Sequence, residues 1–447
     1  MPNFLDLFLN VLRRDRDRFR QMLRGEETTE VNKMLRDAFS AEWHDLPPPK
    51  QKDLHVVAID SGRALREYSS GTFMYICRAV ATSSWGKKYR KVATNFHTIT
   101  SAREYINNMV SLRSEHVEHE VALEALNDFS DVNLVLIDGS LYGRTLHVPM
   151  SFNYPGERDL YLKYMETFDQ LLEECRKRKI LLLGVSKDSV ASHMTKLLMK
   201  DISKKILYDL GQHLPEKYME QLNENLEAIH QRPYPLMRLV ADLPLSDKQR
   251  ETLRSLVNEL RRPRPDFSLL HVWAKTAGYT TPIEPYPEIP LYKYEAKDPL
   301  RYVQRRFPDA IVDYPGKEDD FEKWAHTIME KAFHLPTFVT FCVKLAHNDT
   351  PLRVDLPAFN IGLPTRVSEI SESRRLDPLP DRLGGVLQLL QAEYGGLDQY
   401  NVWLVRADQE ARLPTRDVTT LYEPLIEKEL KTQLALTRRN RRAKYAH

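Results

Sequence analysis

The sequence contains two short apolar runs that finish alike, "VVAID" at residues 56–60 and "LVLIDGS" at residues 134–140. Each run is rich in Val, Leu and Ile, as buried strands are, and each reaches Ile-Asp before a small residue. A lone aspartate after a strand more often forms a turn or caps a helix. The repeated Ile-Asp favours a functional reading, and Asp60 and Asp138 are therefore the first candidate site residues.

The segments around these runs follow the order of a ribonuclease H-like α/β fold. Three strands, a helix, a strand, a helix and a further strand are expected at 54–60, 71–82, 89–97, 101–128, 133–138, 157–179 and 180–189. In that arrangement the strand at 133–138 returns beside the strand at 54–60 and runs parallel to it. Asp60 and Asp138 would then meet at one edge of a mixed sheet, where open α/β sheets tend to place their sites.

The rest of the chain predicts extensions and an insertion around this core. We expect an N-terminal helical segment, the first part of the core, a mostly helical insertion, the second part of the core and a basic C-terminal helix, at 1–49, 50–192, 193–300, 301–415 and 416–447. The second part of the core should contain strands at 336–346 and 351–358. Helices are expected at 379–396, 399–413 and 416–445.

Composition describes a globular protein without strong overall charge. The 447 residues are 42% hydrophobic and 29% charged, with a net charge of +2, so affinity for nucleic acid must come from local patches. Three scattered cysteines form no zinc-binding pattern and fit a reducing cytoplasm. No apolar stretch approaches the roughly 20 residues of a membrane span, and the N-terminus does not read as a secretory signal. We therefore expect a cytoplasmic protein that does not contact a membrane.

Two adjacent carboxylates repel each other and need a cation or a shared proton. Mg²⁺ or Mn²⁺ suits oxygen ligands, and two such ions roughly 4 Å apart can hold and hydrolyse a phosphodiester. A third carboxylate is expected from the helix at 101–128. Glu120 and Glu124 lie one turn apart on one face; Glu120 is our choice, and Glu124 remains possible.

The segments "VVAIDSGRALREYSSGTFMYICRAVA", "LVLIDGSLYGR", "LLLGVSKDS" and "QYNVWLVRADQEARL" together resemble the NurA family of DNA-end-processing nucleases. The resemblance covers roughly residues 50–413, in order. It implies a ribonuclease H-like core that uses manganese, with 5'→3' exonuclease and single-strand endonuclease activity. It also implies a homodimer that works with the HerA-type hexameric DNA translocase, in DNA end resection and repair or in phage defence.

The resemblance also assigns site residues. Asp60 and Asp138 match metal-binding aspartates, and Glu120 matches the helical glutamate. Lys187 matches a Ser-Lys position where it would hold the scissile phosphate; a solvated lysine is the alternative.

This sequence differs from the last motif of the family at two positions. Tyr400 matches an aromatic that members often follow with proline, which is absent here. Asp408 stands where the family often has histidine. An aspartate could still ligate metal there, but it cannot act as a cationic acid near neutral pH.

An apolar stripe near the N-terminus and a basic stretch near the C-terminus each have two possible interpretations. Phe4, Leu7, Phe8 and Val11 lie on one helical stripe, which either packs on its own domain or docks a partner. The tail carries five basic residues, Arg438, Arg439, Arg441, Arg442 and Lys444. These either contact nucleic-acid phosphate or form a solvated helix end.

Two other classes of protein compete with a nuclease. The first is a catalytically silent DNA-binding or motor-docking subunit. The second is an actin-like or sugar-kinase phosphotransferase, because "AIDSGRALREYSSG" (58–71) also resembles a phosphate-binding turn. The chain has only 16 glycines, and "RLGGVLQ" (382–388) has no strand in front of it, so the glycine-rich loops of such kinases are lacking.

Overall fold

The computed structural model describes residues 3–24, 29–51, 53–187, 189–227, 233–287 and 298–438. The chain forms two compact units. The smaller unit consists of residues 1–46, 187–283 and 341–352, and the larger unit of residues 47–186, 284–340 and 353–447. The candidate site residues Asp60, Glu120, Asp138, Tyr400 and Asp408 all belong to the larger unit.

The larger unit is built on a mixed sheet with the strand order β10-β6-β5-β2-β3-β4. Its strands are β2 (Val56–Glu67), β3 (Thr72–Ser83), β4 (Lys88–Thr98), β5 (Leu134–Asp138), β6 (Leu181–Ser186) and β10 (Leu352–Pro357). Strands β2, β3 and β4 pair antiparallel, whereas β5 runs parallel to both β2 and β6. The predictions of an α/β fold, of a mixed sheet and of neighbouring Ile-Asp strands are confirmed.

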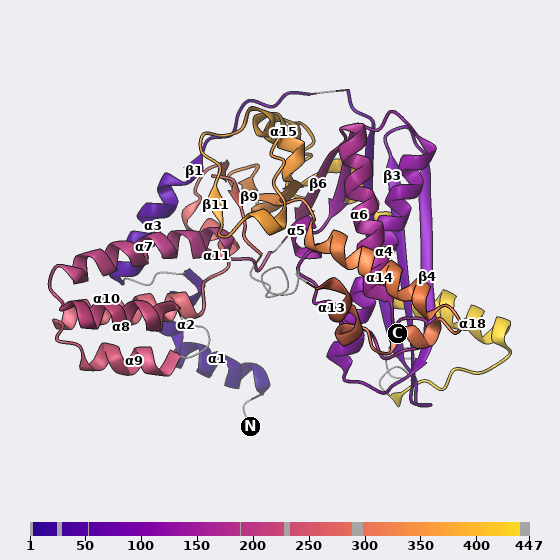
Figure 1. Ribbon diagram of the computed structural model, residues 1–447, viewed down its shortest axis with the longest axis horizontal. Helices are drawn as coiled ribbons and strands as arrows, with labels where there is room; N and C mark the ends of the chain where they lie inside the picture. The colour runs from indigo at the N-terminus through magenta and orange to yellow at the C-terminus, as the bar shows by residue number, and fades with distance from the viewer. Residues whose placement is uncertain are drawn as a thin grey trace. The chain divides into compact units, whose positions relative to one another are not determined.

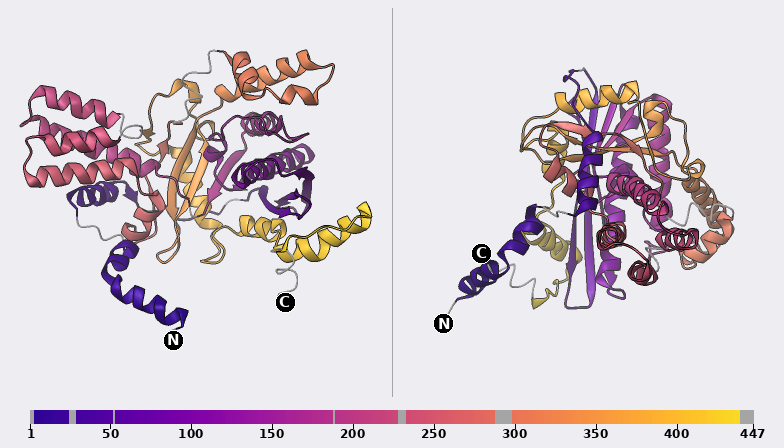
Figure 2. Two further views of the ribbon diagram at one scale, coloured as in Figure 1. Left: turned by 90° about the horizontal axis from the view of Figure 1, so that it is seen from below. Right: turned by 90° about the vertical axis from the view of Figure 1, so that its left-hand side faces the viewer.

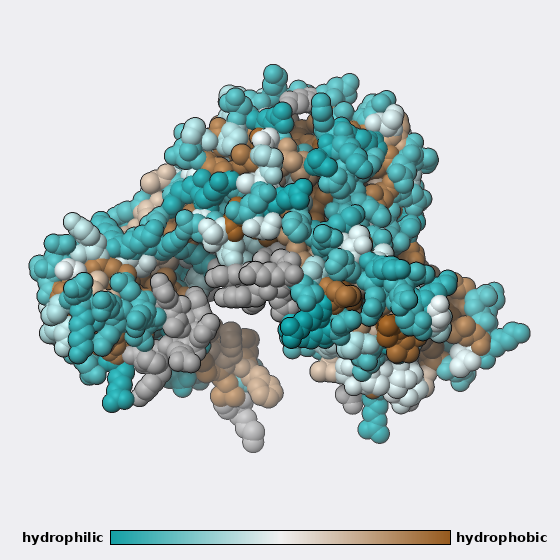
Figure 3. Space-filling view, viewed as in Figure 1, coloured by the Kyte–Doolittle hydropathy of each residue, from teal (hydrophilic) through white to brown (hydrophobic). Residues whose placement is uncertain are grey.

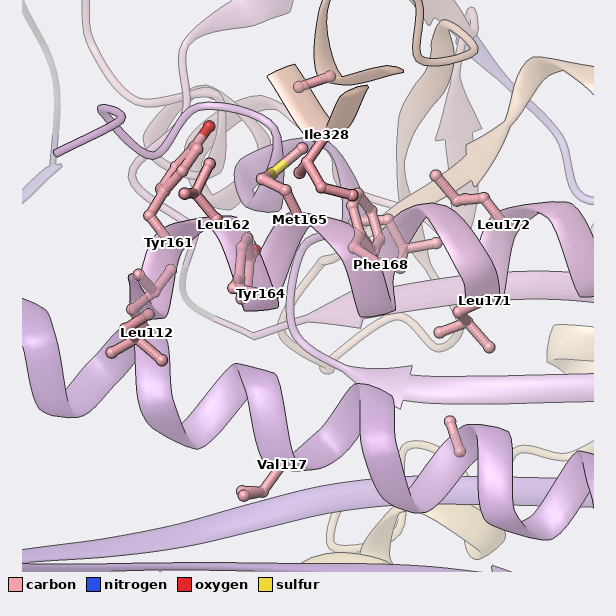
Figure 4. Close-up of a cluster of buried hydrophobic side chains, with 14 of the residues drawn as sticks. Leu112, Val117, Tyr161, Leu162, Tyr164, Met165, Phe168, Leu171, Leu172 and Ile328 are labelled. Carbon is pink, nitrogen blue, oxygen red and sulfur yellow. The ribbon is translucent and has the colours of Figure 1, made fainter. Parts of the chain in front are cut away.

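Helices α4 (Arg103–Asp128) and α6 (Leu160–Arg178) cover one face of this sheet (Figure 1). Figure 4 shows α6 between α4 and Ile328 of α14 (Glu318–Phe333), with its apolar side chains directed to both. Phe168 and Tyr164 of α6 are fully buried in this cluster. Burial of such side chains is worth about 2 kcal/mol each, so the core fixes α4 on the sheet and with it the helix residues that face the strands.

One expectation about the strands is wrong. We expected both Ile-Asp runs to end at their aspartates, and β5 does end at Asp138. Strand β2, however, continues for seven residues past Asp60, to Glu67. The reason is its second neighbour: β2 keeps antiparallel pairing with β3 as far as Glu67, whereas its pairing with β5 stops at Ile59. Asp60 therefore lies inside a long strand, at the point where the parallel neighbour ends.

The smaller unit is mostly helical. It contains α3 (Glu30–Ala41), α7 (His193–Gly211), α8 (Glu216–Glu227), α9 (Pro233–Asp242), α10 (Asp247–Arg261) and α11 (Asp266–Trp273). Helices α7 to α10 lie side by side (Figure 2, left) and share one apolar cluster with α3. Short strands β1 (Trp43–His44) and β7 (Gly278–Thr280) pair with each other, and β7 pairs with the end of β9 (Phe338–Lys344).

The remaining elements include both ends of the chain. They are α1 (Phe4–Arg14), α2 (Arg16–Arg24), α5 (Leu141–Arg144), β8 (Ile283–Glu284), α13 (Pro299–Arg306), η1 (Ala310–Asp313), η2 (Ala358–Ile361), η3 (Val367–Glu369), β11 (Arg374–Arg375), α15 (Asp381–Ala392), α16 (Val402–Ala411), α17 (Thr415–Asp417), η4 (Val418–Tyr422) and α18 (Glu423–Leu430). Across the ranges that the structure describes, helices fall short of the length and apolarity that crossing a bilayer requires.

The predicted continuous helix at 416–445 is wrong in its described part. Helix α18 ends at Leu430, and Lys431 adopts a left-handed conformation with φ of 50°. Such a residue ends a helix because it turns the chain out of the helical path. Leu436 then pairs with Tyr68 as an isolated bridge. The basic residues from Arg439 onward lie outside the described residues.

Candidate functional site

Asp60 and Asp138 lie next to each other on neighbouring strands. The parallel register pairs Ile59 of β2 with Ile137 of β5, so the residues that follow are adjacent. Both side chains are partly buried. The antiparallel partner of Asp60 is Val80, and the parallel partner of Asp138 on β6 is Val185. Apolar strands thus flank the two carboxylates.

Crowding of negative charge changes the acidity of Asp60. Burial, reinforced by Asp138 and Glu118 and more weakly by Asp408, raises the pKa of Asp60 to about 8. The backbone N–H of Ser61, which donates to Asp60 Oδ1 at 2.7 Å, opposes the shift only in part. A carboxyl with such a pKa holds a proton at neutral pH unless a cation replaces it. The site therefore favours binding of a cation.

The third acidic residue is Glu118, which our reading of the sequence missed. It lies on α4 with 4% of its surface exposed. Its Oε1 accepts a hydrogen bond from Ser61 Oγ, and Ser61 follows Asp60 directly. A signal was present in the sequence: Ser114, Ala122 and Ala125 share the helix stripe of Glu118. Small residues on one stripe indicate the face that approaches the sheet closely.

Glu120 does not lie with this group. Its Oε1 instead accepts from Lys91 Nζ of β4 at 3.4 Å. Glu120 and Glu124 both line a surface pocket beside β4. The structure therefore places the predicted Glu120, and Glu124 as its possible substitute, beside β4, and brings Glu118 to the strand that bears Asp60. The cause is helix phase, because one face of α4 meets the strand that bears Asp60 and another meets the basic edge of β4.

Tyr400 contacts the site directly. Its hydroxyl donates to Asp138 Oδ2 at 2.9 Å. Burial, together with the charges of Asp138, Asp60 and Asp408, raises the pKa of Tyr400 far above its usual range, so the phenol stays protonated. Asn401 follows it, where family members often have proline. The Asn401 side chain accepts from Trp403 N and Leu404 N at 3.1 and 3.0 Å, which caps α16 and fixes its start beside Tyr400.

Helix α16 also brings Asp408 to the site, and a glycine lets its end approach the sheet. A Cβ atom on Gly62 of β2 would lie 2.1 Å from the carbonyl oxygen of Ala411. Arg78 of β3 holds that same oxygen, since its Nε donates to it at 2.9 Å. Asp408 is partly buried and is one of the charges that raise the pKa of Asp60. The predicted Asp408 position is thus close to the aspartate pair.

The loop after Asp138 is held by a buried aspartate from β10. Asp355 accepts hydrogen bonds from Ser140 Oγ and, at 3.3 Å, from Tyr142 N. Arg353 contacts both oxygens of Asp355, at 3.0 and 3.2 Å, and neutralises its charge. Asp355 is fully buried. The buried Arg353–Asp355 pair therefore fixes the chain direction after Asp138.

Lys187 follows Ser186, the last residue of β6, and is exposed. It belongs to the smaller unit, whereas the carboxylates belong to the larger one. Its contact with a phosphate stays a prediction.

The donor set of the site consists of oxygens. Asp60, Asp138, Glu118 and Asp408 offer carboxylates, which hard divalent ions prefer. In the described part of the chain, no three acidic, histidine or cysteine side chains already converge as a preformed metal centre. Glu118 is turned toward Ser61 and Arg144, and Tyr400 covers one oxygen of Asp138. The chemistry of these residues fits a divalent cation, because the adjacent carboxylates of Asp60 and Asp138 repel each other unless a positive charge lies between them.

Fold and site together define a mixed α/β protein with an acidic, oxygen-rich centre where β5 ends beside β2. Comparison with protein families then identifies the class more closely: the NurA domain model matches residues 54–413, and the chain belongs to the NurA family. This membership confirms the resemblance and leaves no support for the actin-like or sugar-kinase alternative. No curated protein matches the chain.

A solved structure agrees with this chain at the level of the fold. The crystal structure of the NurA nuclease from Sulfolobus solfataricus is 14% identical, with a TM-score of 0.52, over 96% of this chain and 98% of that chain. A crystal structure of NurA bound to dAMP and manganese is also 14% identical, with a TM-score of 0.45, over 93% of this chain and 97% of that chain. The similarity to the first extends over nearly the whole of both chains.

Proposed function

We propose that this protein is a metal-dependent DNA nuclease with a ribonuclease H-like core. The observation that carries the proposal is the adjacent pair Asp60 and Asp138, placed where the parallel partner of β2 ends. A pKa of about 8 at Asp60 supports it, because the pair favours a cation over two bare charges. Membership in the NurA family supports DNA as the proposed substrate class.

The residues have distinct proposed roles. Asp60, Asp138 and Glu118 hold Mn²⁺, with Mg²⁺ as a possible substitute, and Asp408 is a further candidate ligand. Divalent ions of this kind supply an activated water and neutralise charge on the phosphodiester, and two ions act together in such sites. Tyr400 orients Asp138 through its hydroxyl. Lys187 is the candidate contact for the scissile phosphate, as a point charge.

The type of cleavage and the assembly that we propose are those implied by the resemblance to the NurA family. We propose 5'→3' exonuclease and single-strand endonuclease activity, a homodimer, and work with a HerA-type hexameric ATPase. The setting would be the cytoplasm, in DNA end resection and repair or in phage defence. A centre that binds the sugar-phosphate backbone through metal reads little sequence, so selection of ends must come from such a partner.

The proposal is tested by digestion of linear DNA labelled at either the 5' or the 3' end, with Mn²⁺ and with a chelator. We expect manganese-dependent cutting by the parent, and less than about 1% of its rate after Asp60→Asn or Asp138→Asn, since loss of a metal ligand removes the activated water. Glu120→Gln, on the same helix as Glu118, is the matched control and should keep its rate. A parent that binds DNA but never cuts it would instead establish a silent DNA-binding subunit.

A further inference from the structure

The loop that carries Asp138 also carries a buried arginine. Six residues after Asp138, Arg144 ends the short helix α5 with 3% of its surface exposed. Buried arginines are rare unless their donors are paired. The partners of Arg144 lie on α4, so they link the two segments that supply Asp138 and Glu118.

The arginine makes a forked contact. Its Nη2 donates to Glu118 Oε2, and its Nη1 donates to His119 Nε2 at 2.7 Å. Because the guanidinium can only donate, His119 Nε2 must accept this hydrogen bond and therefore carries no proton. The guanidinium is thus fixed at two points on consecutive helix residues, and its planar geometry leaves the carboxylate of Glu118 little freedom.

The other oxygen of Glu118 bonds to a residue of β2. While Oε2 bonds to Arg144, Oε1 accepts from Ser61 Oγ, next to Asp60. We propose that Arg144 is a positioning residue, which holds one oxygen of Glu118 so that the other stays bonded to Ser61, the neighbour of Asp60 on β2. This inference rests on the proposed function, in which Glu118 is a metal ligand. Partners behind a metal ligand commonly set its orientation and the affinity of the site.

A second buried pair on the same helix provides the control. Arg113 of α4 donates to Glu157 through Nη2, and the exposed fractions of the two side chains are 13% and 2%. Glu157 also accepts from Tyr75. The Arg113–Glu157 pair resembles the Arg144–Glu118 pair in chemistry and burial, but its partners are Tyr75 and His116 instead of the residues around Asp60. If a lysine substitution acted only by destabilising the fold, it should have the same effect at Arg144 as at Arg113.

The test compares Arg144→Lys with Arg113→Lys in the full-length protein. Lysine keeps the charge but lacks the fork. The first readout is the Mn²⁺ concentration that gives half of the thermal stabilisation. We expect this midpoint to rise at least about tenfold in Arg144→Lys and to stay within about twofold in Arg113→Lys. In a Glu118→Gln background, Arg144→Lys should add little, because it acts through Glu118.

The second readout needs no metal. Crystal structures of both variants, grown with chelator, should show the Ser61–Glu118 hydrogen bond lost in Arg144→Lys and kept in Arg113→Lys. His119→Leu, which removes the second acceptor of Arg144, should shift the Mn²⁺ midpoint in the same direction if Arg144→Lys does not fold.

The outcomes separate this inference from the proposed function. An unchanged Mn²⁺ midpoint, equal shifts in both lysine variants, or an intact Ser61–Glu118 bond in Arg144→Lys would each overturn the role of Arg144. A parent protein that neither cuts DNA nor gains stability from Mn²⁺ would overturn the proposed function instead. In that case the crystal structures still decide whether Arg144 positions Glu118.

Discussion

Asp60 links the stability of the protein to pH. Its pKa is about 8 in the folded protein, against 3.8 for an ordinary aspartate. Between these values the unfolded chain releases a proton that the folded protein keeps, so the free energy of unfolding falls as the pH rises. The stabilisation is complete below about pH 4 and is lost as the pH passes through 8.

Replacing Asp60 should remove this dependence. In chelator-treated protein, Asp60→Asn should raise the free energy of unfolding at pH 8 by about 1–3 kcal/mol, since a tenfold change in proton affinity is worth about 1.4 kcal/mol. At pH 5 the parent and the variant should differ little. Urea denaturation at the two pH values measures the difference, with the exposed Asp131→Asn as control. An Asp60→Asn protein with the pH slope of the parent would contradict this account of the site.

Substitutions of Glu118 and Glu120 should have different effects on the rate of DNA cutting. Glu118→Gln should lower manganese-dependent cutting at least about 100-fold, because it removes a charged ligand. Glu120→Gln should change cutting by less than about twofold, because its carboxylate faces Lys91. Rates on end-labelled DNA across a Mn²⁺ titration decide between the two. Loss of activity from Glu120→Gln alone would return the site to the neighbouring face of α4.

For single residues, the sequence allowed us to predict the positions that are set by strand pairing. Asp60 and Asp138 could be placed together because the order of strands forces a parallel return, and pairing then sets the register. Glu118 was missed because α4 carries charged residues on several faces, so apolar spacing alone does not mark the side that meets β2. The stripe of small residues Ser114, Ala122 and Ala125 was the better signal. Arg144 and Asp355 act through tertiary contacts that pattern alone does not reveal.

Among the elements, α16 shows how one departure from a family motif is accommodated. Its start is fixed by the buried Asn401, which stands in place of proline and accepts two backbone hydrogen bonds. Asn401→Ala should cost about 1 kcal/mol of stability, as for other lost caps. Because Tyr400 precedes the cap, cutting should also fall by about tenfold, approaching the effect of Tyr400→Phe.

Denaturation and cutting rates measured on the same samples test this link. Asn401→Asp keeps the capping oxygen and is the matched variant; it should retain the helix start. If Asn401→Ala loses stability while its cutting rate stays at the parental value, the cap has no part in placing Tyr400.

The predicted boundaries of α4, α6 and β3 lie close to the observed ones. The predicted boundaries were wrong where strand pairing or backbone conformation sets the end of an element. Strand β2 passes Asp60 because β3 still pairs with it, and α18 stops at Leu430 because Lys431 takes a left-handed conformation. The basic, helix-compatible sequence that follows contains no glycine or proline to signal that stop.

For the whole molecule, the open question is what covers α1. Within Phe4–Arg14 no residue is buried, and Phe4 and Phe8 are 92% and 57% exposed. The apolar surface of α1 is visible in Figure 3 near the N-terminus. An exposed apolar stripe of this kind commonly marks an interaction surface. Of the two readings of this segment, partner docking therefore has more support than packing on its own domain.

The last prediction concerns the proposed motor. Phe8→Asp combined with Val11→Asp should weaken association with the HerA-type ATPase at least about tenfold, because each charge must lose water in an apolar interface. Manganese-dependent cutting of short single-stranded DNA should persist at the parental rate, since Asp60, Glu118 and Asp138 belong to the other unit.

Leu421→Asp with Leu425→Asp, on the equally exposed C-terminal segment, is the matched control. Co-elution of protein and motor measures affinity, and light scattering of the protein alone tells whether the same change splits a homodimer. Unchanged co-elution with an intact dimer would remove α1 from both interfaces, and the stripe would then need another partner. A variant that becomes monomeric and also loses the motor would show that the two assemblies share this helix.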